Sequence, residues 1–194
     1  VLVEILNRHL QAPAVYLINF SERLFNMWEF NGTKRPTFAE QTEEFQESVW
    51  DYPRPPIAQK VAKHILVKLG RLVVAETSEA IRILETASPP SYYLPPNAIN
   101  IDLIDFNESS FCEWKGKATY LGIDNVNSNP IGWVYRTPSV PFLSIKDYVG
   151  FYPGRIECFL DAERVRPQPG IFYGGWVTDT LTGPFKGEPG TGWW

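Results

Sequence analysis

Four residues carry side chains suited to acid, base or nucleophilic chemistry. Cys112 and Glu113 are adjacent, Lys115 follows two positions later, and Glu85 ends an apolar run earlier in the chain. A nucleophilic thiol needs a base beside it, and two carboxylates that converge can act as general acid and base. Exposed or ion-paired carboxylates with a structural thiol are the simpler interpretation. Glu85, Cys112 and Glu113 are therefore weaker acid/base or thiol candidates.

No complete catalytic motif accompanies these residues. His9 and His64 are the only histidines, and the sequence places neither beside the thiol. Asp102 and Asp105 resemble a metal-binding pair, but no Gly-Ser turn precedes them and a strand would point them to opposite faces. The chain has no glycine-rich phosphate loop, and its two solitary cysteines form no zinc motif. We predict no metal and no cofactor, and the sequence leaves open whether the protein is an enzyme.

Aromatic side chains are the larger group of ligand-binding candidates. Trp and Tyr offer flat, rigid surfaces with a polar tip, which suit a ring or a cation. Lys115 and Lys186 stand at matching places and could hold an anionic group. Most of these rings must also fill the core of so small a domain. The candidate ligand-binding residues are Trp50, Tyr52, Tyr93, Trp114, Lys115, Trp133, Tyr135, Tyr173 and Trp176.

The elements that position these residues are predicted to be mainly strands. The 194 residues include 17 Pro, 14 Gly and 7 Trp, which favours short strands, many turns and aromatic interiors. A net charge of −4 gives no bulk electrostatic reason to bind nucleic acid. The longest apolar stretch, 14–20, is too short to span a membrane. With two cysteines and no signal-peptide pattern, we expect a cytoplasmic protein with reduced thiols.

Residues 1–48 are predicted to form a helical extension. Apolar residues recur at helical spacing over 2–10 and 17–28. Thr37 and Glu40 have the spacing of a capping box, which predicts a helix running to about Ser48. The apolar faces of these helices need a cover. The main domain could supply it, or a second subunit could, which would make a homodimer.

Residues 49–194 are predicted to form the β domain. One short helix is expected over about 140–149, with Phe142, Ile145 and Val149 on its buried side. The proline-rich segment 88–96 is excluded from the centre of a sheet because proline lacks the N–H donor. Strands are predicted at 61–69, 71–76, 80–84, 117–123, 131–135, 155–160 and 172–177.

An internal repeat divides this domain into halves of about 50–125 and 131–194. Trp50-x-Tyr52-x-x-Pro55 recurs as Trp133-x-Tyr135-x-x-Pro138. Gly-Arg, an aromatic pair and Lys-Gly then follow in the same order in each half, with drifting spacing. Two small β units that cannot cover their own apolar faces would pack around a pseudo-two-fold axis. The groove between them is a natural ligand site.

Longer motifs carry a family resemblance. The chain resembles the family known as domain of unknown function 427, also filed as nucleotidyltransferase-like, from about residue 47 to the C-terminus. The resemblance implies two β-tent units related by a pseudo-two-fold axis. Residues 1–45 lie outside it, and the Asn-rich segment 121–132 departs from its pattern. The motifs are 50–56, 84–86, 89–96, 110–116, 148–153, 167–170, 172–176 and 183–187.

Three functions follow from these observations. The favoured hypothesis is a small-molecule-binding domain with an aromatic-lined cleft between its halves. The first alternative is a structural or interaction module that dimerises through the N-terminal helices. The second is an enzyme with a Glu/Cys/Lys site, although no motif supports the nucleotidyltransferase label. The binding hypothesis is favoured because aromatic residues are plentiful whereas the catalytic set is incomplete.

Overall fold

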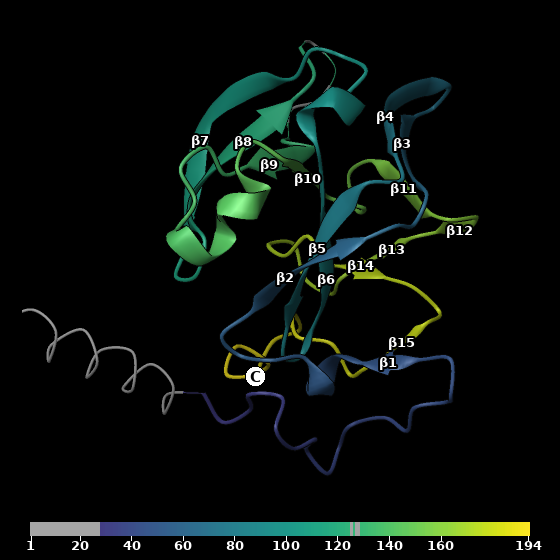
Figure 1. Ribbon diagram of the computed structural model, residues 1–194, viewed down its shortest axis with the longest axis vertical. Coiled ribbons are helices and arrows are strands. Elements are labelled where there is room, and N and C mark those ends of the chain that lie inside the picture. The colour runs from purple at the N-terminus through teal and green to yellow at the C-terminus, as the bar shows by residue number, and fades with distance from the viewer. Residues whose placement is uncertain (1–27, 125, 127–128) are drawn as a thin grey trace, which may run out of the picture. The chain divides into compact units, whose positions relative to one another are not determined.

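The computed structural model describes residues 28–124, 126 and 129–194 (Figure 1). Phe30–Gly192 and Trp194 form one compact unit, which is mainly β as predicted. No helix among the described residues is long and apolar enough to cross a lipid bilayer. The strands are β1 Glu47–Ser48, β2 Ile57–Val61, β3 Ile65–Leu69, β4 Leu72–Thr77, β5 Ala80–Glu85, β6 Ser88–Leu94, β7 Ile104–Cys112, β8 Gly116–Gly122, β9 Gly132–Val134, β10 Val149–Phe151, β11 Glu157–Leu160, β12 Glu163–Arg164, β13 Arg166–Pro167, β14 Trp176–Val177 and β15 Leu181–Thr182. The 3-10 helices are η2 Val49–Asp51, η3 Pro96–Ala98 and η4 Val140–Ile145.

A seven-stranded antiparallel sheet runs in the order β2-β5-β6-β10-β9-β8-β7 (Figure 1). A second antiparallel sheet has the order β12-β11-β3-β4. Each sheet mixes strands from both predicted halves, because β6 pairs with β10, β8 with β9, and β3 with β11. Neither predicted half therefore forms a sheet by itself.

Side chains alternate between two cores across the seven-stranded sheet, as the strand period of two requires. Tyr92 and Leu94 enter core 1, whereas Tyr93 between them enters core 2. On β9, Val134 joins core 1 and Trp133 joins core 2. Core 1 also holds side chains of the four-stranded sheet, so it connects the two sheets.

A third core, core 3, is built around Val49, Trp50, Tyr52, Leu84 and Ala87. It joins the segment that begins at Phe30 to the C-terminal segment. Trp50 is fully buried there, 5.2 Å from the Phe38 ring and 5.3 Å from that of Trp194. The strands β1 and β15 pair in parallel beside this core. Long-range contacts thus order residues 30–48.

The predicted helix from Thr37 to Ser48 is wrong. Residues 39–46 form no helix, and Glu47 and Ser48 form β1. The Glu40 carboxylate accepts the N–H of Gly183 at 2.7 Å, so this side chain binds a distant segment and caps no helix. The helices predicted at 2–10 and 17–28 lie outside the described residues, except for Trp28.

The exclusion of residues 88–96 from a sheet is also wrong. Strand β6 lies between β5 and β10 although it contains Pro89 and Pro90. The register with β5 shifts between Ile83 and Glu85, opposite these prolines, and β10 pairs only with Tyr93 and Leu94. The missing N–H groups therefore fall at a bulge, where the ladder does not need them.

Other predicted boundaries shift. The strand predicted at 61–69 is split into the end of β2 and β3, and that at 172–177 is reduced to β14. The segment 140–149 forms η4 and then enters β10; Phe142 and Ile145 are buried as predicted. The sequence analysis missed β7, the longest strand of the described residues. Its Asp, Asn, Glu and Ser side chains interrupt the alternation of apolar and polar residues by which a strand is recognised.

Trp133 requires small residues opposite it. A Cβ on Gly150 would lie 2.6 Å from the indole, and one on Gly174 would lie 2.3 Å from it. We predict that Gly150→Ala lowers the free energy of unfolding by about 1–3 kcal/mol, since overpacking outweighs the entropy that alanine removes from the unfolded chain. Urea denaturation measures the change. Gly192→Ala is the control because no atom lies within 4 Å of its Cβ; equal effects would contradict the prediction.

Buried tyrosines make stability fall at alkaline pH. Tyr92 is 4% exposed, and burial raises its pKa to about 12. The unfolded chain loses this proton near pH 10, so the stabilisation is complete below pH 10 and is lost as pH rises through 12. We predict a loss of about 1.4 kcal/mol per pH unit per such tyrosine in that window. Urea denaturation at a series of pH values from 9 to 12 tests this. The Tyr92→Phe variant should lower the slope of the free energy of unfolding against pH by the contribution of one proton.

Candidate functional site

Most predicted ligand-binding rings lie in the cores. Trp50 and Tyr52 belong to core 3, and Trp176 to core 1. Tyr93, Trp133 and Tyr135 belong to core 2, each 6% exposed or less. Trp114 is partly buried, and Tyr173 is 37% exposed. These last two are the aromatic candidates that solvent reaches.

Lys115 is held in the turn between β7 and β8. Gly116 follows it with φ of +95°, which only glycine adopts without strain. Ser139, which precedes η4, fixes this turn: its N–H donates to the Lys115 carbonyl at 3.1 Å and its hydroxyl to the Trp114 carbonyl at 2.5 Å. The ammonium lies 5.9 Å from the Phe142 ring centroid on η4. The long β7–β8 hairpin and η4 thus position one lysine, which is only 9% exposed.

Polar groups surround the Lys115 ammonium. Burial lowers the pKa of Lys115, but Tyr93, Cys112 and Glu85 outweigh this, so the pKa lies above the ordinary lysine value. The Tyr93 hydroxyl accepts the indole N–H of Trp133 at 3.1 Å, and burial raises the pKa of Tyr93. Burial, Tyr93 and Cys112 likewise raise the pKa of Tyr135. At neutral pH the site therefore presents an ammonium that interacts with the protonated hydroxyl of Tyr93.

Glu85 connects Lys115 to two further buried cations. The Arg54 side chain is 2% exposed, and its Nη2 lies 3.4 Å from Glu85 Oε1. Arg54 also donates to the carbonyls of Phe30 and Thr86, at 3.2 and 2.9 Å. Lys186 is 6% exposed and interacts electrostatically with both Arg54 and Glu85. Burial of charge is costly, so such cations need nearby negative charge.

Lys186 resembles Lys115 in its local setting. Gly187 follows it with φ of +139°, as Gly116 follows Lys115. Its ammonium donates to the backbone oxygen of Trp194 at 3.0 Å and lies 6.0 Å from the Tyr173 ring centroid. Burial and Arg54 lower the pKa of Lys186, against the opposing effect of Glu85 and Glu113.

These residues form one group, which we call the Glu85 cluster. Its members come from the end of β5, the β7–β8 turn and the segments before β2, before β14 and after β15. They can attract an anion through three cations and offer a partly exposed aromatic face and a partly exposed thiol. The Glu85 cluster consists of Arg54, Glu85, Cys112, Glu113, Lys115, Tyr173 and Lys186.

Within the cluster, Glu85 accepts a hydrogen bond from Arg54, and Glu113 is exposed. The remaining residues considered for catalysis are not members of it. Asp102 and Asp105 are both exposed, and Asp105 pairs with Arg136 at 2.6 Å. His64 pairs with Glu76 at 2.8 Å, and His9 lies outside the described residues. Within 28–124, 126 and 129–194, no three His, Cys, Asp or Glu side chains gather as a metal site would require.

The sequence analysis missed a cavity elsewhere in the unit. It lies among the segment 40–46, β13, β14 and β15, and none of the predicted site residues lines it. Glu40 was assigned to a helix cap, and the motifs at 167–170 and 183–187, which contain Pro167, Pro169 and Phe185, gave no indication that these residues line a cavity. The parallel pairing of β1 with β15 brings the two sides of this cavity together. No local sequence pattern predicts such a long-range pairing.

Comparison with known proteins identifies a family. No curated protein matches the chain. The family match covers β2 to the residues just after β11, and so includes Glu85, Cys112, Glu113 and Lys115 but neither Arg54 nor Lys186. Residues 57–162 match the family described as a domain of unknown function, DUF427, and because this is more than half of the chain, the protein belongs to that family.

Proposed function

We propose that this protein binds a small molecule through an acidic group held by the Glu85 cluster. The observation that carries the proposal is that three cations, Arg54, Lys115 and Lys186, all at most 9% exposed, gather around Glu85 and interact with it electrostatically. Glu113 also acts on Arg54 and Lys186, but it is exposed, and water screens it. A ligand carboxylate or phosphate supplies the negative charge that these cations favour.

The position of the cluster supports a site at the junction of the two predicted halves. Arg54, Glu85 and Lys115 come from the first half, whereas Tyr173 and Lys186 come from the second. The two lysines occupy matching places in the proposed repeat, and each precedes a glycine of positive φ. A pseudo-two-fold pair of β-tent units would bring such equivalent turns to one seam. The proposed ligand therefore contacts both halves.

The aromatic neighbours indicate a ligand with a flat apolar part. Tyr173 presents a partly exposed ring beside Lys186. A small aromatic acid could place its ring against Tyr173 and its acidic group near Lys186. The buried rings of the cores serve to hold these groups in place.

Replacing Lys115 tests the proposal. Phenyl phosphate is the probe, and isothermal titration calorimetry measures its binding. We expect the wild type to bind it, and Lys115→Met to weaken binding by about tenfold or more, as the loss of a charge-assisted hydrogen bond predicts. Methionine keeps an apolar chain against Phe142, which preserves the packing of the turn.

Two controls accompany this measurement. Lys117→Met removes an exposed lysine from the same hairpin and leaves the affinity unchanged. Benzyl alcohol, which has a similar ring and no charge, binds the wild type much more weakly than phenyl phosphate does. Equal affinities of the two lysine variants, or no binding of phenyl phosphate to the wild type, would contradict the proposal.

A further inference from the structure

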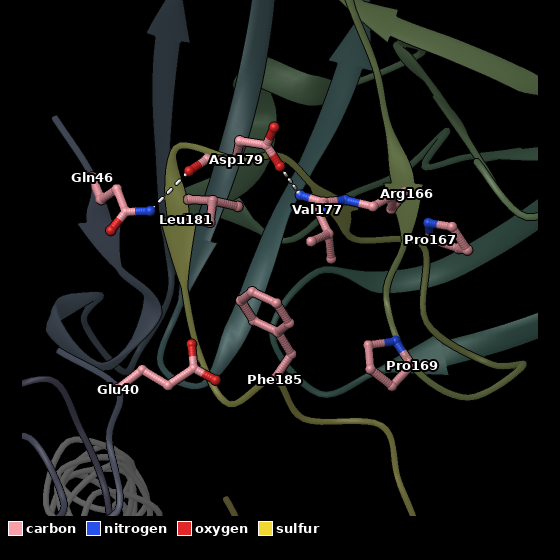
Figure 2. A pocket seen from close by; sticks show the side chains of 9 residues that line it. All are labelled: Glu40, Gln46, Arg166, Pro167, Pro169, Val177, Asp179, Leu181 and Phe185. Carbon is pink, nitrogen blue, oxygen red and sulfur yellow. Dashed lines mark hydrogen bonds and ion pairs between the residues drawn. The ribbon is translucent and has the colours of Figure 1, made fainter. Parts of the chain in front are cut away.

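An open cavity of about 400 Å³ lies beside β15 (Figure 2), and none of its lining residues belongs to the Glu85 cluster. We call it the Phe185 cavity. Five of its nine lining residues are apolar, and the others place charged or amide groups around them. Its lining residues are Glu40, Gln46, Arg166, Pro167, Pro169, Val177, Asp179, Leu181 and Phe185.

The apolar wall of the Phe185 cavity is preformed. Val177 stands opposite Arg166 in the β13–β14 pair, and Leu181 stands opposite Glu47 in the β1–β15 pair. Phe185 packs against core 3 from the same side. Strand pairing and two proline rings thus hold the wall without a ligand, so a small apolar body could enter at little ordering cost.

The basic group of this cavity already has carboxylate partners. Arg166 lies 2.6 Å from Asp179 and 3.9 Å from Glu163. The Gln46 amide donates to the Asp179 carbonyl at 3.0 Å, as Figure 2 shows. The Arg166 guanidinium is therefore matched by acidic groups and offers an anionic ligand little net attraction.

Glu40 is an acidic group that the fold holds at the opposite side. Its backbone N–H donates to the Gly183 carbonyl at 2.9 Å, and its Oε2 accepts the Gly183 N–H at 2.7 Å. Its Oε1 has no hydrogen-bond partner among the described residues. Figure 2 shows the carboxylate directed toward the Phe185 ring. The fold thus holds one acceptor oxygen at the edge of an apolar wall.

We propose that the Phe185 cavity binds a primary amine on a small apolar body. The ammonium donates to Glu40 Oε1, and the apolar body lies against Phe185, Leu181 and Val177. The lining carries two carboxylates and one guanidinium, so its net charge of −1 favours a cation. The face of the Phe185 ring adds a cation–π attraction for an ammonium bound nearby.

This site is independent of the Glu85 cluster. The two share no residue, and they select ligands of opposite charge. The lining residues of the Phe185 cavity also all lie outside the range matched by the family, 57–162. The segments that build the amine site thus flank the matched range.

Titration with hexylamine tests the inference. Backbone amide shifts in two-dimensional NMR report binding, and we expect the amides of Val177 and Leu181 to move. Glu40→Gln should weaken hexylamine about fivefold or more, because the ion pair is lost while an amide oxygen remains for the Gly183 N–H. Glu44→Gln removes an exposed carboxylate from the same segment but not from the cavity, and it should bind as the wild type does.

Comparison of probes keeps the test valid even if Glu40→Gln is destabilised. In the wild type, hexylamine should bind about fivefold or more tightly than 1-hexanol, and hexanoate should leave the Val177 and Leu181 amides unmoved. Equal affinity for hexylamine and 1-hexanol overturns the proposal. So does the failure of hexylamine to move these amides, or its undiminished binding to a folded Glu40→Gln variant. Lys115→Met should not alter hexylamine binding.

Discussion

The packing of Trp133 against two glycines is the constraint on which the two-faced sheet depends. Its indole fills the space where side chains of Gly150 and Gly174 would stand. It also lies 4.5 Å from the Tyr152 ring and donates to the Tyr93 hydroxyl. One ring thus connects β6, β9, β10 and the segment before β14. Because β6 belongs to the first predicted half and the others to the second, the halves fold as one unit.

This shared core determines where charge can be buried. Core 2 fixes Tyr93, which interacts electrostatically with Lys115, and the Phe142 ring on η4, over which the ammonium lies. An ammonium so placed keeps polar neighbours although little solvent reaches it, which reduces the cost of its burial. Positioning Lys115 therefore needs the β7–β8 hairpin, β6, β9 and η4 together. The cluster can therefore form only when the seven-stranded sheet is folded.

Sequence patterns predicted those parts of the fold that local physics decides. The apolar runs of β4 and β5 predicted strands that the structure has, and the spacing of Phe142 and Ile145 predicted their burial. Long-range pairing decided the rest. Glu40 has a helix-cap spacing but bonds Gly183, and Pro89-Pro90 lies in a strand because the bulge opposite removes the need for its donors. The sequence made Lys115 a candidate but gave no sign of the Phe185 cavity, because the β1–β15 pairing creates it.

The two buried lysines differ in their hydrogen bonds, and this difference assigns a structural role to Lys186 and leaves Lys115 for the proposed binding. Lys186 donates to the backbone oxygen of Trp194, and so it holds the segment that packs Trp194 on Phe38 and Trp50. Burial and the nearby Arg54 cation lower the pKa of Lys186. Lys115 holds no backbone oxygen among the described residues, and its pKa is raised. Because its ammonium is not committed to such a backbone bond, Lys115 is the better placed of the two lysines to meet a ligand, and it stands at the centre of the site that we propose.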